Sequence, residues 1–201
     1  NLTKNIKIEG YADLLNPALK GKIAAADPAA SSSAFEHLVN MLYAMGNGNP
    51  EKGWDYVKKL CANLDGKLLS GSSAVYKGVA DGEYAVGLTY EEGGINYVVS
   101  GSPVKVIYMK EGVISKPEGV YIIKGAKNLE NAKKFIDYCV SLDAQNILIN
   151  KVNRRAIRKD ASSSEVVIPM TEIYSIKDDP DFVESNRQKW LDKFRDIYTG
   201  I

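Results

Sequence analysis

The densest group of side chains able to bind a ligand is the run Thr89-Tyr90-Glu91-Glu92. It places a phenol beside two carboxylates, directly after the mostly apolar segment 84–88, which predicts a strand. In open α/β sheets, ligands bind beyond the carboxyl ends of the strands. We therefore expect Tyr90, Glu91 and Glu92 to form a ligand site. A one-residue change of strand register decides which of the two carboxylates faces the ligand.

Serines gather just before two predicted helices. Ser70–Ser73 precede a short helix that Asp81-Gly82 ends, and Ser31–Ser33 precede a longer one. Serine hydroxyls and the free backbone N–H groups of a helix start both bind anions. The serines expected to contact an anionic group are Ser31, Ser32, Ser33, Ser72 and Ser73. The alternative is that they only cap the helices, with Ser33 and Glu36 forming a capping box.

The residues do not suggest a nucleophilic triad. His37 is the single histidine, and it falls mid-helix beside core positions, which favours a structural or solvated role. Glu91 and Glu92 are paired carboxylates, but acid–base catalysis would need a pocket that keeps one of them protonated. A small cytosolic α/β enzyme using these two residues is the alternative to a binding protein.

Composition excludes several classes of protein. The chain has 201 residues and a net charge of +1 with scattered Lys and Arg, so no nucleic-acid groove is expected. No apolar run approaches the roughly 20 residues of a membrane helix. Cys61 and Cys139 fall on apolar helical stripes, which predicts buried free thiols, and no Cys/His cluster indicates zinc. No signal peptide opens the chain, which predicts a cytosolic protein or a processed or truncated form.

Strands alternate with helices along the chain, which predicts an α/β fold. The expected strands are 22–26, 67–69, 84–88, 104–109 and 119–123. Phe35, Leu38, Val39 and Leu42 recur with helical spacing. A later helix, capped by Asn128, is expected to turn an apolar side inward, made of Ala132, Phe135, Ile136 and Cys139.

The order of short motifs resembles one family. Asp13-Leu14-Leu15-Asn16-Pro17, Lys20-Gly21-Lys22-Ile23 and Asp27-Pro28-Ala29 with Ser31–Ser33 are similar to its opening pattern. The later motifs are Gly71-Ser72-Ser73, Gly82–Gly87, Pro117–Val120, Lys124–Asn128 and Ala132–Asp137. This family is the extracellular solute-binding proteins of ABC importers, in the ferric-iron and phosphonate-type branch. The resemblance covers almost the whole chain.

The resemblance implies a type 2 periplasmic-binding-protein fold, in which two α/β lobes close on a ligand. It assigns residues 1–112 and 152–201 to lobe two and residues 113–151 to lobe one. The chain then looks like a fragment without most of lobe one, so the apolar faces of 113–151 need a cover. We expect a homodimer or swapped dimer to supply it. The resemblance also implies a location outside the cytoplasmic membrane, tethered to the cell surface as a lipoprotein or free, and delivery of solute to an ABC permease.

Three ligands fit the residue types, and none is an obligatory cofactor. Ferric iron is favoured, with Tyr90 as a phenolate ligand helped by Glu91 or Glu92; family members that bind iron carry adjacent tyrosines here, whereas this chain has Glu91. A phosphate or phosphonate ester is the second, held by the serines while a glutamate takes hydroxyls or an ammonium. An organic cation against Tyr90 and the carboxylates is the third. Arg155 is expected to line the cleft, the alternative being a solvated strand face.

Overall fold

A computed structural model describes residues 2–3 and 5–200 and divides the chain into two units. Unit 1 combines Asn1–Ser115 with Met170–Ile201, and unit 2 is Lys116–Pro169. Unit 1 is therefore discontinuous, and unit 2 is inserted into it after residue 115 and up to residue 169. The boundaries implied by the resemblance lie after residues 112 and 151. The assignment of each unit to a lobe stays a prediction.

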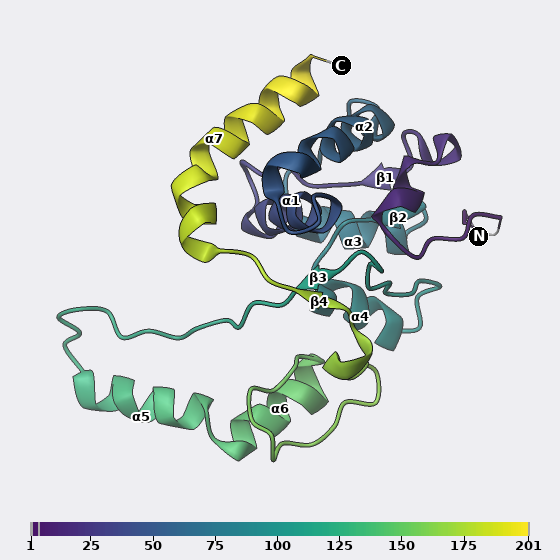
Figure 1. The fold of residues 1–201 in the computed structure, drawn as a ribbon. Coiled ribbons are helices and arrows are strands. Elements are labelled where there is room, and N and C mark those ends of the chain that lie inside the picture. The colour runs from purple at the N-terminus through teal and green to yellow at the C-terminus, as the bar shows by residue number, and fades with distance from the viewer. Residues whose placement is uncertain (1, 4, 201) are drawn as a thin grey trace. The chain divides into compact units, whose positions relative to one another are not determined.

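Unit 1 contains most of the regular structure (Figure 1). Its α-helices are α1 (Ser32–Met45), α2 (Trp54–Leu64), α3 (Ser72–Ala80), α4 (Glu91–Val99) and α7 (Pro180–Thr199). Its 3₁₀ helices are η1 (Tyr11–Leu15), η2 (Pro17–Leu19), η3 (Pro50–Gly53) and η4 (Met170–Glu172). Its strands are β1 (Ile23–Ala24), β2 (Val86–Gly87), β3 (Val113–Ile114) and β4 (Ser175–Ile176). Within the described chain, no helix is both long and apolar enough to cross a bilayer.

All the strand pairing among the described residues of unit 1 is parallel. β1 pairs with β2 in the register Ile23↔Val86, and β3 pairs with β4. An isolated parallel bridge joins Ala26 to Leu69 on the other side of β1. The strand expected at 67–69 is thus reduced to one bridge. The strand expected at 104–109 is not one, because the segment packs its side chains against helix α4 and the core instead of completing a ladder.

The core of unit 1 follows the predicted helical spacing. Phe35, Leu38, Val39 and Leu42 of α1 are all completely buried. Burying side chains of this size contributes about 1.5–3 kcal/mol each. They meet apolar residues of α2 and α7, among them Val57, Leu60, Trp190 and Phe194. The predicted stripe is therefore confirmed, and it fixes α1 against the sheet.

One buried amide ties helix α1 to two distant segments. The Asn40 Nδ2 group donates to the Tyr11 hydroxyl (2.8 Å) and to the Gly112 carbonyl (3.0 Å). Its Oδ1 atom accepts from the Ile114 N–H at 2.6 Å. Asn40 is only 6% exposed, so these three bonds replace the water that the amide loses on folding. Through them α1 sets the positions of η1 and of the start of β3.

Unit 2 contains α5 (Leu129–Cys139) and α6 (Leu142–Val152). The inward face predicted for α5 is wrong for this chain: none of its residues is buried, and Phe135 is 61% exposed. The segment 119–123 forms no strand, and Tyr121 is 86% exposed. The helical periodicity correctly marks the apolar side of α5, but within unit 2 nothing buries that side. Other exposed apolar side chains of this unit are Val120, Ile123, Leu129, Tyr138, Val140, Leu142, Ile147, Ile157, Val166 and Ile168.

Replacing Asn40 tests the buried amide. We expect Asn40→Ala to lower the free energy of unfolding by about 2–4 kcal/mol, because buried polar groups of Tyr11, Gly112 and Ile114 lose their hydrogen-bond partner. Urea denaturation followed by circular dichroism measures the change. The matched control is Asn5→Ala at an exposed position, expected to change stability by less than about 0.5 kcal/mol. Equal effects of the two substitutions would contradict the role given to Asn40.

The exposed apolar side chains of unit 2 predict that the 201-residue chain self-associates. Sedimentation velocity at about 10 and 100 µM should show a dimer whose fraction rises with concentration. Phe135→Glu should shift the population toward monomer, whereas Val99→Glu, at an exposed apolar position in unit 1, should not. A wild-type chain that is monomeric at both concentrations would refute the prediction.

Candidate functional site

The parallel sheet brings three helix starts to one edge. Three neighbouring strand segments, around Leu69, Ala24 and Gly87, run in the same direction. Each is followed by a helix: α3 after Leu69, α1 after β1, and α4 after β2. The carboxyl ends of parallel strands lie together, so the helix N-termini that follow them do too. This edge carries the partial positive charge of three helix dipoles.

The start of α1 carries a cluster of hydroxyls. Ser31 is the N-cap, and its Oγ accepts from the Ala34 N–H at 3.4 Å. Its hydroxyl also lies 3.1 Å from that of Ser33, which sits in the first turn. The predicted cap at Ser33 with Glu36 is therefore wrong by two residues. The cause is the turn before the helix, in which the Asp27 carbonyl accepts from the Ser31 N–H at 3.0 Å.

The start of α3 has no side-chain cap. Gly71 is the N-cap residue, so Ser72 and Ser73 are the first two helical residues, and the prediction that they cap the helix is wrong. A Cβ atom built at Gly71 would meet nothing within 4 Å, so this end is open. The first amides of α3 are thus placed where an anion can reach them.

The start of α4 carries the aromatic and acidic residues. Tyr90 is the N-cap residue and is 38% exposed, and Glu91 and Glu92 form the first turn. The Tyr90 ring meets the Tyr76 ring edge-on, with the centroids 6.0 Å apart. Tyr76 in turn packs on Gly93, where a Cβ atom would come within 2.5 Å of its ring. Gly93 therefore lets α3 and α4 approach closely enough for the two rings to meet.

A hydrogen bond fixes one of the two carboxylates. The Tyr108 hydroxyl donates to Glu91 Oε1 at 2.6 Å. This contact is not among those that the sequence predicts. The signal that could have found it is the alternation in 104–109, which sends Tyr108 to the face opposite the core-packed Ile107 and Met109.

The remaining predicted residue, Arg155, belongs to unit 2 and is half-buried. Its neighbour Arg154 forms an ion pair with Glu118 of the same unit. The structure thus gathers the predicted serines, Tyr90, Glu91 and Glu92 at one edge of unit 1. A contribution of Arg155 to that site stays a prediction.

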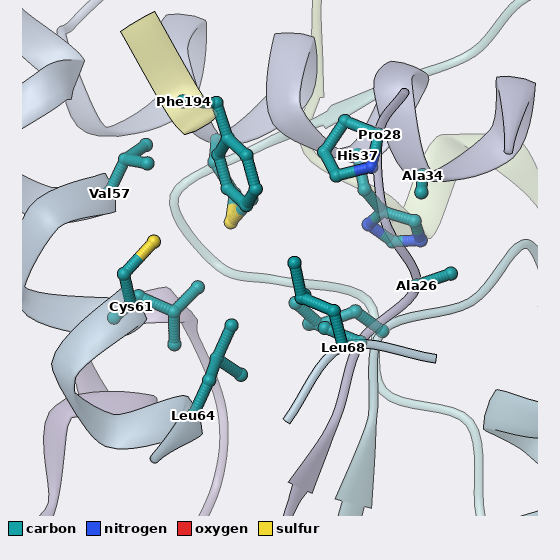
Figure 2. Close-up of a pocket in the computed structure, with 13 residues that line it drawn as sticks. Ala26, Pro28, Ala34, His37, Val57, Cys61, Leu64, Leu68 and Phe194 are labelled. Carbon is teal, nitrogen blue, oxygen red and sulfur yellow. The ribbon is translucent and has the colours of Figure 1, made fainter. Parts of the chain in front are cut away.

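A small apolar cavity lies among α1, α2 and α7 in unit 1 (Figure 2). Its volume of about 20 Å³ holds one water molecule at most, so it is not a solute site. Cys61 lines it, and burial raises the pKa of this thiol to about 12, which keeps it protonated. Both cysteines are free; Cys61 is buried as expected, whereas Cys139 is only half-buried.

His37 also lines this cavity and stays neutral. Burial lowers the pKa of its imidazole. A hydrogen bond with the Thr89 backbone and the negative charge of Glu36 raise this pKa, but by less. Its Nδ1 atom is buried with no hydrogen-bond partner among the described residues. Over the same part of the chain, no group of three His, Cys, Asp or Glu side chains is placed to hold a metal. His37 is therefore a structural residue next to Thr89, which follows β2.

Comparison with known proteins gives one family. The model of the bacterial extracellular solute-binding protein family matches residues 2–182. The chain is 29% identical over 137 residues to a protein of Haemophilus influenzae, covering 68% of this chain and 38% of that one.

Solved structures share the fold. The periplasmic binding protein AfuA of Actinobacillus pleuropneumoniae, with fructose 6-phosphate bound, is 26% identical and superposes with a TM-score of 0.86 over 98% of this chain and 62% of AfuA. An apo ferric ion-binding protein A of Pasteurella haemolytica is 17% identical, with a TM-score of 0.75 over 97% of this chain and 64% of that one. The chain thus spans about three fifths of the length of these proteins.

The pH dependence of stability tests the state of His37. Because its folded-state pKa lies below the unfolded value of 6.5, the unfolded chain takes up the proton first as the pH falls. We expect the free energy of unfolding to fall between pH 7 and pH 5, by at most about 1.4 kcal/mol per pH unit. In His37→Gln this slope should be much smaller, since the chain has no other histidine. Equal slopes in the two proteins would show that His37 is not held neutral.

Proposed function

Because the chain belongs to the bacterial extracellular solute-binding proteins, we propose that it captures a phosphorylated organic solute for an ABC importer. Its fold is that of the type 2 periplasmic binding proteins. In this proposal it works outside the cytoplasmic membrane and hands the solute to a membrane permease. The solute is bound and released unchanged, without turnover.

The observation that carries the choice of ligand is the convergence of three helix N-termini at one edge of unit 1. Of these, the start of α3 is open: its N-cap residue is Gly71, and no side chain accepts a hydrogen bond from its first amides. Amides of this kind, with the dipoles behind them, favour a phosphate group. The hydroxyls of Ser31 and Ser33, 3.1 Å apart at the start of α1, add polar groups at the same edge. The fructose 6-phosphate bound to AfuA supports the same chemistry for this chain.

The organic part of the solute meets the start of α4 in this proposal. Glu91 and Glu92 would repel a phosphate, so they suit hydroxyls or an ammonium group instead. The Tyr90 ring, exposed beside them, offers an apolar face to a sugar ring or a cation. An organic cation alone would use these groups but leave the open start of α3 without a role.

Ferric iron, favoured from the sequence, is the second candidate. Tyr90 and Glu91 would supply hard oxygen ligands, and ferric-binding proteins share the fold. We rank it second because a cation would leave the open start of α3 and its serines without a role.

Titration calorimetry of the 201-residue chain tests the proposal. We expect fructose 6-phosphate to bind with a dissociation constant in the millimolar range or below, and fructose or ferric citrate to give no heat of binding. Ser72→Ala removes a hydroxyl, and Ser72→Pro also removes the first amide of α3 while keeping a residue that a helix tolerates at this position. Each hydrogen bond to the charged phosphate should be worth roughly tenfold in affinity.

A matched control separates lost contacts from a damaged helix. Leu142 occupies the same first position in α6, so Leu142→Pro makes the same backbone change in unit 2 and should leave binding intact. No binding of fructose 6-phosphate by the wild-type chain, or equal loss in Ser72→Pro and Leu142→Pro, would refute the proposed site. Saturable binding of ferric citrate that Tyr90→Phe abolishes would favour iron instead.

A further inference from the structure

We propose that Tyr108 is a positioning residue that holds the Glu91 carboxylate as the acceptor for a solute hydroxyl. The site thereby selects polyhydroxylated phosphate esters over simple ones. This inference rests on the proposed function, and it adds the residue that sets the choice of organic group.

The packing of the segment 104–109 against α4 directs Tyr108 to the start of that helix. Val106 lies against Gly94, where a Cβ atom would come within 2.7 Å of Val106 Cγ2. Two residues further on, Tyr108 reaches Glu91, three residues back along the helix. Gly94 and Glu91 share one face of α4, because residues three apart are neighbours on a helix. The segment therefore runs along α4 toward its N-terminus.

The rest of the segment keeps the phenol in place. Ile107 and Met109, on the opposite face, pack against the main core of unit 1. Just beyond, the Lys110 N–H donates to the Glu9 carbonyl at 3.0 Å. These contacts fix the backbone on both sides of Tyr108, and the 2.6 Å hydrogen bond holds its hydroxyl on Glu91 Oε1.

The contact has a consequence for selectivity. A carboxylate beside an anion site repels every phosphate group, whatever its organic part. A carboxylate accepts several hydrogen bonds, so accepting from Tyr108 is compatible with accepting another from a solute. A solute hydroxyl in that position offsets the repulsion, whereas a simple ester meets the repulsion alone. Specificity then comes from an attractive and a repulsive element together.

The test compares fructose 6-phosphate with methyl phosphate, which has no hydroxyl to donate once its phosphate is fully ionised. At pH 8 both are dianions, since the second pKa of a phosphate ester is about 6. The quantity measured is the ratio of the two dissociation constants. We expect Tyr108→Phe to lower this selectivity about tenfold by weakening fructose 6-phosphate, with methyl phosphate affinity unchanged within twofold. Glu91→Gln should lower it too, partly by tightening methyl phosphate.

Tyr56→Phe is the matched control, because the Tyr56 hydroxyl donates a similar hydrogen bond, to the Tyr11 carbonyl at 2.8 Å, within the core. It should lower stability but leave the selectivity ratio unchanged. If both esters bind the wild-type chain and neither Tyr108→Phe nor Glu91→Gln alters the ratio, Tyr108 has no positioning role. If neither ester binds the wild-type chain, the proposed function fails and this inference fails with it.

Discussion

Parallel pairing around β1 is the constraint on which the rest of unit 1 depends. β1 pairs with β2 on one side and continues to a bridge with Leu69 on the other, all in one direction. Parallel neighbours require a crossover each time, and the helices that make the crossovers all begin at the same edge. The positions of α1, α3 and α4 are thus consequences of strand direction. The chemistry of the edge then depends on which residues stand at those three helix starts.

Buried polar groups keep this arrangement in one register. Asn40 joins α1 to η1 and to the start of β3. Asn63 of α2 holds η1 from the other side, donating to the Leu14 carbonyl at 2.8 Å. Each bond is made in a site closed to water, so a shifted helix would leave a buried donor or acceptor unpaired. Apolar burial supplies most of the stability of unit 1, and these amides restrict the geometry it can adopt.

Much of unit 1 could be predicted from the sequence because its elements carry their own signals. The spacing of Phe35, Leu38 and Leu42 predicts the buried face of α1, and the polar cluster after β2 predicts the place of Tyr90. Three consecutive serines give the same local signal, so the pattern predicts the cap of α1 at Ser33 and not at Ser31. The choice of Ser31 follows from the turn at Asp27, which depends on the strand before it. Tyr108 was missed because its contact is with a residue 17 positions away.

Unit 2 shows a different limit of sequence reasoning. Periodicity tells which side of α5 is apolar, but it does not tell what covers that side. Phe135 was expected inside and is exposed, although its place on the stripe was correct. The expected strand at 119–123 fails for a related reason: a β-branched run forms a strand only where a partner strand offers a ladder. The domain boundaries derived from the resemblance differ from those of the two units, because few local signals mark the end of an insertion.

The edge formed by the starts of α1, α3 and α4 is proposed to bind the phosphate group of a solute. A crystal structure of the chain with fructose 6-phosphate would show where that group binds. The phosphate oxygens should lie within about 3 Å of the Ser72 and Ser73 amides. A phosphate bound away from this edge would rule the proposal out.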